Sequence, residues 1–359
     1  MLRVLLYYPR ARAGDGGMTH AVRSLADELT CLGTQVTIVF DGGEIGPTND
    51  GIRWIGLRHV GRRFLRFPLG LSDAFKDADV VVLHSAWTSE NVRAAAVARR
   101  LGLPYVLAPR GSYDPMIVRR KRLLKQSWFA LFERTLIKRA RAIHVFFDSE
   151  AAHLRSLGYR GEFVVAPNGV RTPDGRAWDG GSGGYLLWLG RFDPEHKGLD
   201  ILLDAMARIP VAQRTPLRLH GPDWRERKGA VRHRIAELGL ESSVTVGDPV
   251  YEDEKWRLLE RAAGFVYPSR WEAFGNSPAE AVAMGVPTLV TPYPLGRHLS
   301  DNGAAFVAAA TPESLADGLK RLTSSDAARV AANGARFVRS ELTWGACARA
   351  WLQQLEALA

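Results

Sequence analysis

The sequence predicts an α/β protein built from two doubly wound domains, and three observations lead to this fold class. Short apolar runs alternate with longer amphipathic segments along the whole chain, which is typical of a parallel sheet covered by helices. The 359 residues are enough for two domains of ordinary size. A hydrophobic content of 46% with 24% charged residues is typical of a globular protein with a sizeable core.

The first half of the chain supplies the first of the two sheets. Apolar runs bounded by turn residues predict its strands, and the longer amphipathic segments between them predict its helices. We expect strands at 4–8, 34–40, 80–84, 104–109, 142–147 and 163–170, helices at about 19–32 and 90–101, and a basic helical region at 116–141. A less regular stretch rich in basic and aromatic residues separates the second and third strands.

The stretch RTPDGRAWDGGSGG at 171–184 lacks an apolar period and is the best linker candidate in the chain. Alternation of strands and helices resumes after it. We expect strands at 185–190, 217–221, 244–248, 264–269, 287–291 and 304–309. Helices are expected at about 198–208, 225–239 and 252–262, in a short segment after Ser277, and between the last strand and the C-terminus. The chain is therefore divided into domains at 1–165 and 166–340, followed by a helical segment at 341–359.

The net charge of +10 lies entirely in the first half of the chain. Residues 1–170 hold 25 Lys and Arg against 15 Asp and Glu, whereas residues 171–359 hold 23 of each. The excess is concentrated in RRFLRF at 62–67, RRKRLLK at 119–125 and RTLIKRARA at 134–142. This pattern indicates that the first half binds an anionic membrane surface, an anionic acceptor or nucleic acid, or that its helices only expose charged faces to solvent. Nucleic acid is disfavoured because the sequence contains no recognised module that binds it.

Cysteine usage and hydropathy indicate the compartment. Cys31 and Cys347 have no neighbours at metal-ligand spacing, so neither a disulfide framework nor a zinc site is expected. No apolar run reaches the roughly 18 residues of a membrane-spanning helix. We expect a cytoplasmic protein, peripheral at the inner face of the membrane if its basic half meets lipid.

The segment RWEAFGNSPAEAVAMGVP at 270–287 carries Glu272 and Glu280 on either side of a helix start. Ser277 is expected to cap this helix, with Pro278 at the first position and Glu280 completing a capping box. Capping alone explains Glu280 as well as a ligand does. Glu272 lies in a loop at the carboxyl end of a strand, where open α/β sheets bind ligands. Because a helix start also favours phosphate, the segment predicts a nucleotide or sugar-phosphate site.

Two further loops point to an anionic ligand. LGRFDPEHKGLD at 189–200 places Arg191 and Lys197 before a helix, and two such cations suit a diphosphate whose charge grows when a bond to it breaks. The alternative is two solvated cations, which is less favoured because this loop and that of Glu272 lie at the same edge of one sheet. DGGMTHA at 15–21 is either a tight turn or a glycine loop whose amides approach an anion.

Together these motifs resemble glycosyltransferase family 4. The resemblance is carried by GRFDPEHKGLD, by PNGV at 167–170, and above all by EAFGNSPAE followed by A-x-x-x-G-V-P, and it is strongest from 163 to 300. Members of this family are retaining nucleotide-sugar transferases with the GT-B fold, in which two Rossmann-like domains face each other across a cleft. The resemblance implies that 1–165 binds the acceptor, that 166–340 binds the nucleotide-sugar, and that 341–359 packs back toward the first domain.

The resemblance also assigns a role to each matching residue. Arg191 and Lys197 would hold the donor diphosphate and neutralise the leaving group, and Glu272 would lie by the transferred sugar as the third catalytic residue. The donor-binding set would comprise Glu280 at the ribose hydroxyls, Val250 at the base, Phe274, Gly275, Asn276 and Ser277 around the sugar and phosphates, and Gly16 and Gly17 in a loop of the first domain.

One departure follows the strand at 104–109, where many relatives carry a histidine. This chain has Pro109-Arg110-Gly111, which resembles a subgroup acting in bacterial surface-polysaccharide assembly. We expect Arg110 to meet the donor or an anionic acceptor, and His84 either to face the acceptor or to be structural. Asp77-Ala78-Asp79 imitates a metal-binding D-x-D motif, but it precedes a strand at the wrong end of the sheet, so no metal is expected.

The sequence therefore predicts a retaining, metal-independent glycosyltransferase without a cofactor. It would move a hexose from a UDP- or GDP-sugar to a saccharide, lipid-linked or small-molecule acceptor in bacterial polysaccharide or glycoconjugate biosynthesis. A sugar-nucleotide epimerase, an NAD-dependent enzyme and a basic nucleic-acid-binding protein stay open as alternatives. A retaining glycosidase, with carboxylates about 5 Å apart, would leave the two cations without a diphosphate. We expect Glu272→Ala and Lys197→Ala each to remove most transfer and leave the fold intact.

Overall fold

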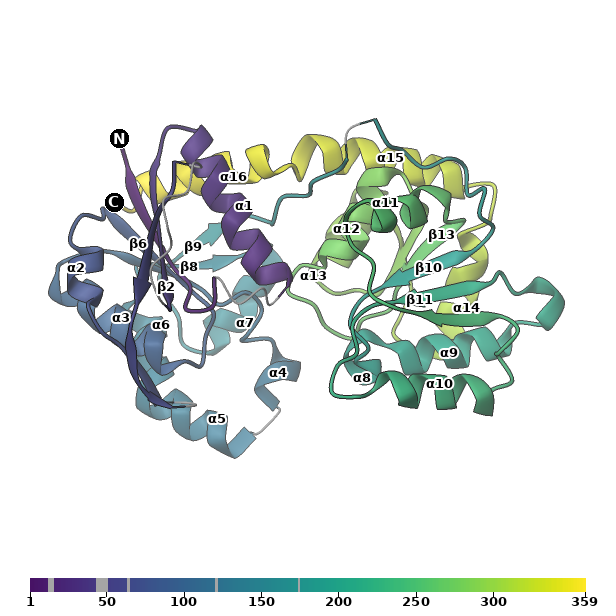
Figure 1. Ribbon diagram of the computed structural model, residues 1–359, viewed down its shortest axis with the longest axis horizontal. Coiled ribbons are helices and arrows are strands. Elements are labelled where there is room, and N and C mark those ends of the chain that lie inside the picture. The colour runs from purple at the N-terminus through teal and green to yellow at the C-terminus, as the bar shows by residue number, and fades with distance from the viewer. Residues whose placement is uncertain (12–15, 43–50, 63–64, 120–121, 174) are drawn as a thin grey trace. The chain divides into compact units, whose positions relative to one another are not determined.

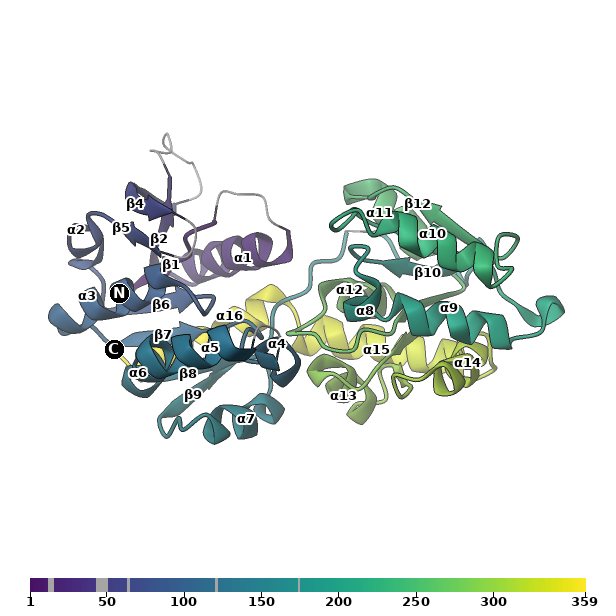
Figure 2. The same ribbon diagram turned by 90° about the horizontal axis from the view of Figure 1, so that it is seen from below.

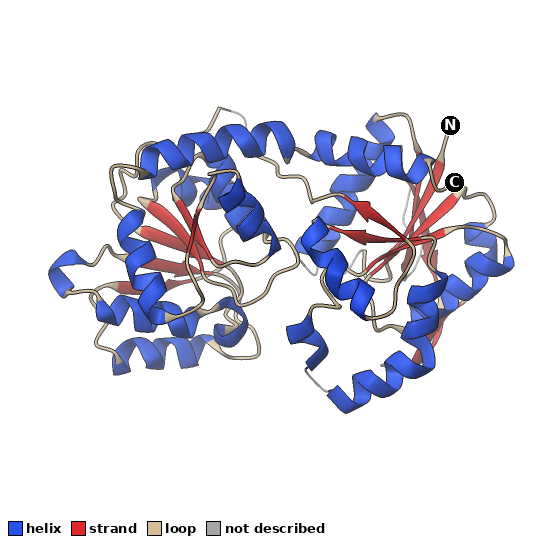
Figure 3. Cartoon of the chain, turned by 180° about the vertical axis from the view of Figure 1, so that it is seen from behind, coloured by secondary structure: helices blue, strands red, loops and turns tan. Residues whose placement is uncertain are grey.

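The computed structural model describes residues 1–11, 16–42, 51–62, 65–119, 122–173 and 175–359, and it confirms the α/β fold class (Figure 1). These residues form two compact units, Met1–Gly169 with Thr343–Ala359, and Val170–Leu342. The boundaries expected from the sequence, after residues 165 and 340, lie a few residues before those of the units. Each unit is built around one parallel sheet with helices on both faces, and Figure 3 shows the helices in blue and the strands in red.

The sheet of the first unit has seven parallel strands. In spatial order they are β3 (Arg53–Leu57), β2 (Gln35–Asp41), β1 (Arg3–Tyr7), β6 (Val80–His84), β7 (Tyr105–Ala108), β8 (Ala142–Val145) and β9 (Glu162–Val165). The irregular stretch between the second and third predicted strands holds β3 and an antiparallel hairpin of β4 (His59–Arg62) and β5 (Leu65–Pro68), none of which the sequence predicted. Residues 63–64 of the basic cluster RRFLRF lie outside the described residues.

The central strand β1 shows why its sequence is an unbroken apolar run. Val4 and Leu6 belong to the core on one face of the sheet, together with residues of α1 (Gly17–Cys31) and α16 (Trp344–Glu356). Leu5 and Tyr7 belong to the core on the opposite face. A strand covered on both faces must be apolar at every position, which is the pattern of a buried parallel strand.

The remaining helices of the first unit include the basic region expected at 116–141, which is interrupted. They are α2 (Leu71–Phe75), α3 (Ser89–Arg100), α4 (Pro115–Arg119), α5 (Arg122–Trp128), a π-helical turn η1 (Phe129–Glu133), α6 (Arg134–Arg139), the 3₁₀ turn η2 (Asp148–Glu150) and α7 (Ala151–Ser156). Figure 2 shows α4, α5 and α6 following one another along one side of the unit. Residues 120–121 of the cluster RRKRLLK lie outside the described residues.

The sheet of the second unit has six parallel strands. Their spatial order is β12 (Val244–Gly247), β11 (Leu217–His220), β10 (Leu186–Leu189), β13 (Gly264–Tyr267), β14 (Thr288–Val290) and β15 (Phe306–Val307). The helices are α8 (Pro194–Lys197), α9 (Leu199–Arg208), the 3₁₀ turn η3 (Val211–Gln213), α10 (Lys228–Glu237), α11 (Glu252–Arg261), α12 (Asn276–Met284), α13 (Pro294–Asp301), α14 (Pro312–Arg321) and α15 (Ala327–Glu341).

The prediction of a free linker at 171–184 is wrong, because the described residues of this stretch pack onto the second unit. The backbone amide of Trp178 donates to the carbonyl of Met284 (2.9 Å), and its indole donates to the carbonyl of Ala262 (2.7 Å). Arg176 pairs with Glu260 at 3.1 Å and with Asp253. Composition identified the loop correctly, but a tryptophan and an arginine anchor it. Residue 174 lies outside the described residues.

The final helix α16 belongs to the first unit, although the second unit precedes it in the chain. Trp344, Ala348, Trp351 and Leu355 lie in the same core cluster as residues of α1 and β1. The side chain of Gln354 also exchanges two hydrogen bonds with the backbone of Val165, at 2.8 and 3.0 Å. Among the described residues, no helix is long and apolar enough to span a membrane.

Candidate functional site

The loops that carry the predicted catalytic residues lie side by side at the carboxyl edge of the second sheet. Strands β10 and β13 pair in parallel, although 75 residues separate Lys197 from Glu272. Arg191 and Lys197 follow β10, and Glu272 follows β13. Because parallel strands end at a common edge, the pairing of β10 with β13 brings these side chains together.

Lys197 and Glu272 form a buried ion pair. The ammonium group of Lys197 contacts Oε1 of Glu272 and donates a hydrogen bond to the hydroxyl of Tyr267 at 2.7 Å. Tyr267 in turn donates to Oε1 of Glu272 at 3.1 Å, and Ser269 donates to the same oxygen at 2.8 Å. The carboxylate is therefore fixed by three donors, and the sequence analysis had not singled out Tyr267 or Ser269.

The environment keeps Glu272 ionised. Burial raises the pKa of a carboxyl group, but Lys197, His196 and the hydrogen bond from Ser269 outweigh burial and hold the pKa of Glu272 below its ordinary value. The same carboxylate, together with burial, raises the pKa of Tyr267 well above its ordinary value. At neutral pH the site therefore holds a carboxylate, a neutral phenol and the side chain of Lys197 in mutual contact.

A close approach at Gly198 sets the position of Lys197. Gly198 has a φ of +66°, and a β-carbon at this position would lie 2.0 Å from the carbonyl oxygen of Pro268. Only glycine therefore lets the end of α8 meet the loop that follows β13. The carbonyl of His196 accepts a hydrogen bond from the amide of Arg270 (2.9 Å), which ties the two loops together.

His196 is a site residue that the sequence analysis missed. Its ring stacks on Trp271, with centroids 4.2 Å apart and planes 2° from parallel. Nε2 lies 2.8 Å from the carbonyl oxygen of Trp271, and Nδ1 lies 3.3 Å from Nη2 of Arg191. Nε2 must carry the proton to donate to a carbonyl, which leaves Nδ1 to accept from Arg191. A histidine beside the motif lysine was the available signal.

The pKa of His196 agrees with this neutral tautomer. Burial above all, together with the charges of Lys197 and Arg191, lowers it to about 4 against the opposing effect of Glu272. The guanidinium of Arg191 also lies 4.5 Å from the ring centroid of Trp224, which is a cation–π contact. Arg191 is thus held between an aromatic ring and a neutral imidazole at the edge where β10 ends.

Glu280 lies on α12 and contacts a different lysine. Its Oε1 lies 2.9 Å from Nζ of Lys255 in α11. Burial raises the pKa of Glu280, and Lys255 opposes that effect. The predicted capping box is wrong, because α12 begins at Asn276, its N-cap is Gly275 with a φ of +95°, and no side chain caps it. The glycine enters the left-handed region and starts the helix two residues earlier than a serine cap would.

The other predicted donor-binding residues of this unit lie around the same edge. Phe274 is buried, Gly275 lies close to Tyr293, and Asn276 and Ser277 form the first turn of α12. Val250 lies in the loop between β12 and α11 and is partly exposed. These loops follow β13 and β12, so the second unit brings its predicted residues to one edge, while their contacts with a donor stay predictions.

In the first unit, Arg110 is buried and held by its own unit. Nη1 donates to Oδ1 of Asn168 at 2.7 Å, and the guanidinium lies 5.3 Å from the ring centroid of Phe146 and 5.9 Å from that of Trp351. Burial lowers the pKa of Arg110 to about 10, and Glu150 and Tyr8 oppose the shift. Its φ of +52° is unusual for a residue with a β-carbon. Only 8% of its surface is exposed.

His84 and the glycine pair occupy different environments at the carboxyl edge of the first sheet. His84 ends β6 and is completely buried, its pKa is lowered well below the ordinary value by burial, and neither ring nitrogen has a hydrogen-bond partner among the described residues. Gly16 and Gly17 are exposed where α1 begins, and Gly16 has a φ of +85°. Their expected roles at a donor or acceptor stay predictions.

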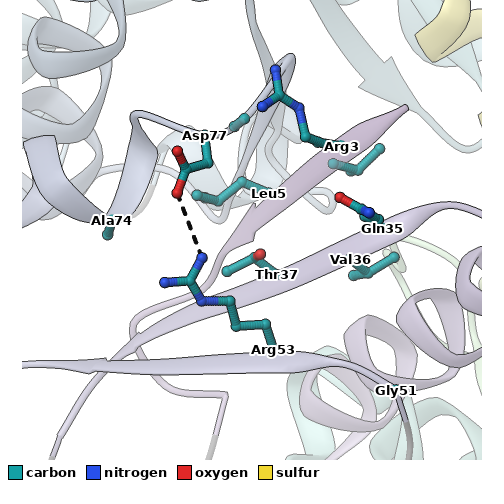
Figure 4. Close-up of a pocket in the computed structure, with 11 residues that line it drawn as sticks. Arg3, Leu5, Gln35, Val36, Thr37, Gly51, Arg53, Ala74 and Asp77 are labelled. Carbon is teal, nitrogen blue, oxygen red and sulfur yellow. Dashed lines mark ion pairs between the residues drawn. The ribbon is translucent and has the colours of Figure 1, made fainter. Parts of the chain in front are cut away.

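The amino edge of the first sheet holds a cavity of about 240 Å³ that no motif indicated (Figure 4). The labelled residues come from β1, β2 and the start of β3, from α2, and from the turn between α2 and β6. Asp77 of the D-x-D sequence pairs there with Arg53 at 3.6 Å, and Asp79 pairs with Arg3. Arginine partners occupy both carboxylates, and the edge is opposite to that where parallel sheets bind ligands.

Comparison with known proteins finds a glycosyltransferase model in each unit. The model described as "Glycosyl transferases group 1" matches residues 183–325, and the model described as "Glycosyl transferase 4-like domain" matches residues 16–169. The two matches lie one in each unit and together cover most of the chain, which is therefore a glycosyltransferase. Both loops of the candidate site, after β10 and after β13, fall within the first match, and Gly16, His84 and Arg110 fall within the second.

Curated relatives of this glycosyltransferase include the GDP-mannose:cellobiosyl-diphosphopolyprenol alpha-mannosyltransferase of Xanthomonas oryzae pv. oryzae. The two are 27% identical over 309 residues, which are 81% of this chain and 79% of the relative. Other curated relatives that match over shorter stretches are also named for mannosyl transfer, including mannosyltransferases of lipopolysaccharide core and O-antigen synthesis.

Solved structures confirm the fold. Sucrose-phosphate synthase from Thermosynechococcus elongatus has a TM-score of 0.80 at 18% identity, over 100% of this chain and 99% of that one. Anabaena HepE in complex with UDP and glucose has a TM-score of 0.76 at 16% identity, also over 100% and 99%. At such identities the likeness concerns the fold alone, and it establishes the GT-B class that the motifs implied.

Proposed function

We propose that this glycosyltransferase moves mannose from GDP-mannose to a lipid-linked saccharide, with retention of the anomeric configuration and without a metal. The observation that carries the proposal is the buried Lys197–Glu272 pair beside Arg191 at the carboxyl edge of the second sheet. The choice of donor rests on the curated relatives, whose names specify mannosyl transfer and in one case GDP-mannose with a diphosphopolyprenol acceptor.

The proposed chemistry assigns the leaving group to the two cations. Arg191 and Lys197 would bind the diphosphate of the donor and stabilise the charge that grows on it as the glycosidic bond breaks. Two fixed cations can supply the stabilisation that a metal gives in other transferases, which is why none is proposed. Lys197 would then share its charge between Glu272 and a phosphate oxygen, while His196 keeps Arg191 in place.

Glu272 and Glu280 would bind hydroxyl groups rather than attack the sugar. Each carboxylate already has a lysine partner, Lys197 for Glu272 and Lys255 for Glu280, and the two lysines lie on different helices. An ionised carboxylate accepts hydrogen bonds from sugar hydroxyls. Front-face transfer then gives retention without a protein nucleophile, because the departing diphosphate takes the proton of the attacking acceptor.

The alternatives lose support for stated reasons. A glycosidase has no leaving diphosphate for Arg191 and Lys197 to hold. An epimerase of the same architecture would use the same donor edge, but the matched relatives are named as transferases. Nucleic acid would explain the basic first half and would leave the ion pairs of the second unit without a role.

A donor screen followed by product analysis tests the proposal. GDP-mannose should raise the melting temperature more than UDP-glucose, UDP-galactose or GDP alone, and NMR of the product should show an α-linked mannose whose yield does not change with EDTA. A β-linked product, loss of turnover in EDTA, or stabilisation by UDP-sugars only would overturn the corresponding part. Conversion of the donor without any acceptor would favour the epimerase.

A further inference from the structure

A group of exposed apolar side chains lies on α4, α5 and η1 of the first unit. We call it the α4–α5 surface, and its members are Met116, Leu123, Leu124, Leu131 and Phe132. Leu123 is 80% exposed and Leu131 is 69% exposed, values at which a leucine has almost no contact with its own protein. In Figures 1 and 3, α5 stands out from the body of its unit.

This exposure is concentrated in the chain, although the first unit also exposes a second group, Val60, Leu65, Phe67 and Leu69, on and directly after β4 and β5. In the described part of the second unit, the exposed large apolar residues are Val211, Trp224 and Tyr251, which come from three separate loops and turns. Single exposed apolar residues need no explanation, whereas a cluster of five within 17 positions indicates a surface that meets an apolar phase or partner.

The charge of the same segment restricts what that partner can be. Residues 115–142 contain nine Lys and Arg and one acidic residue, Glu133. Glu133 is completely buried, whereas Arg119, Arg134, Lys138 and Arg139 are exposed. Within 115–142 the exposed charge of the described positions is therefore positive, and the partly exposed Asp114 lies just before this range, at the amide of Met116. An apolar surface flanked in sequence by cations complements an anionic lipid surface, in which the leucines enter the headgroup region and the cations meet phosphates.

Glu133 connects this surface to the carboxyl edge of the first sheet. Its Oε1 accepts from the amide of Trp87 (3.1 Å) and from the hydroxyl of Tyr113 (2.6 Å), and its Oε2 accepts from the indole of Trp128 (2.9 Å). Trp87 follows β6, and Tyr113 follows β7. The π-helical turn η1 ends at Glu133, so this turn aims the carboxylate inward.

We propose that the α4–α5 surface docks on an anionic lipid bilayer and holds the loops after β6 and β7 at the membrane. The inference rests on the proposed function, because those loops lie on the side where a lipid-linked acceptor is expected. The helix lies in the interface rather than across it, since α5 is far too short to span a bilayer. The lipid, and not a sequence-specific protein contact, supplies the affinity.

Vesicle sedimentation tests the docking directly. The protein should sediment with vesicles of phosphatidylglycerol and phosphatidylcholine at low salt, and should stay in the supernatant with phosphatidylcholine alone or at high salt. Leu123→Ser/Leu131→Ser should lower the partition coefficient at least about tenfold, because two leucine side chains no longer enter the lipid. Val211→Ser is the matched control, since Val211 is 67% exposed in the second unit, and it should sediment like the wild type.

Activity separates this inference from the proposed function. The double variant should transfer to a short, water-soluble acceptor like the wild type, and should lose at least about tenfold in rate when the acceptor is embedded in vesicles. If the wild type transfers no sugar yet sediments with anionic vesicles, the proposed function fails and the docking surface stands. If the wild type ignores anionic vesicles, or the double variant sediments like the wild type, the docking proposal is overturned.

Discussion

The carboxyl edges of the two sheets treat buried charge in opposite ways. At the edge of the second sheet each buried or half-buried lysine has a carboxylate partner, as in Lys197–Glu272, Lys255–Glu280 and Lys228–Asp248. At the edge of the first sheet the buried cation is Arg110. It contacts the side-chain amide of Asn168 and the rings of Phe146 and Trp351, and no described carboxylate forms a hydrogen bond with it.

This difference indicates which of the two edges is built to bind a charged ligand. A buried ion pair costs desolvation energy that its own attraction often fails to recover, so its presence is weak evidence for stability. The Lys197–Glu272 pair is better explained if Glu272 holds Lys197 in position to contact a negatively charged ligand. Arg110, by contrast, packs between Phe146 and Trp351 like a core side chain and joins α16 to the first sheet.

The largest expected effect comes from breaking the Lys197–Glu272 ion pair. Lys197→Ala should lower kcat/KM by about 100-fold or more, because a cation aimed at the leaving group is lost. It should also lower the free energy of unfolding by about 3–5 kcal/mol, since Glu272 is left buried and unpaired. The structure thus changes the expectation that either single variant leaves the fold intact. Urea unfolding and donor turnover measure the two effects.

An exposed pair of the same unit serves as the control. Arg208 pairs with Glu313, and the two side chains are 48% and 66% exposed. Arg208→Ala should cost about 1 kcal/mol or less and leave transfer unchanged. The double variant Lys197→Met/Glu272→Leu should regain much of the lost stability and stay inactive. Normal turnover in Lys197→Ala would remove this residue from the catalytic set.

A second prediction sharpens the comparison through backbone geometry. Gly198→Ala should lower the free energy of unfolding by about 2 kcal/mol or more, because its β-carbon would collide with the carbonyl of Pro268. Lys197 would move with the shifted backbone, so transfer should fall as well. Gly229→Ala is the matched control, since nothing lies within 4 Å of a β-carbon there, and it should stabilise α10 by up to about 1 kcal/mol. Equal stability of the two variants would refute the close approach.

A third prediction compares histidines. His196 accepts from Arg191 and donates to Trp271, whereas His84 does neither. His196→Ala should raise KM for the donor about tenfold with a smaller change in kcat, because Arg191 loses one hydrogen bond. His196→Gln can make both bonds and should restore KM at pH 7. A fall in kcat alone, or failure of glutamine to rescue, would contradict the positioning role.

The pH dependence of stability gives a separate measure of His196. Its pKa is about 4 when folded and 6.5 as the unperturbed value. Between these values the unfolded chain binds a proton that the folded chain does not, so stability is full above pH 6.5 and is lost as pH falls toward 4. The wild type should lose up to about 3 kcal/mol more than His196→Gln over this window. His84 and His144 titrate in both proteins and cancel in the comparison.

Local sequence rules predicted most strands and helices but failed where a distant contact competed with them. The capping box at Ser277 is a sound local pattern, yet Gly275 adopts a left-handed conformation and starts α12 two residues earlier. The linker at 171–184 has the composition of a free loop, yet Trp178 and Arg176 anchor it to residues about 84 positions away. Residues 53–57 of the irregular stretch form β3 because β2 offers an edge to pair with, while β4 and β5 pair with each other in a separate sheet.

The sequence by itself determined the alternation of strands and helices, the concentration of positive charge in the first half, and the loops that hold Arg191, Lys197 and Glu272. These properties depend on neighbouring residues and on composition. Only the tertiary structure decided that Lys197 pairs with Glu272 and Glu280 with Lys255, that His196 supports Arg191, and that Arg110 is buried against α16. Such pairings depend on strand order and on close approaches between distant segments, which local sequence does not specify.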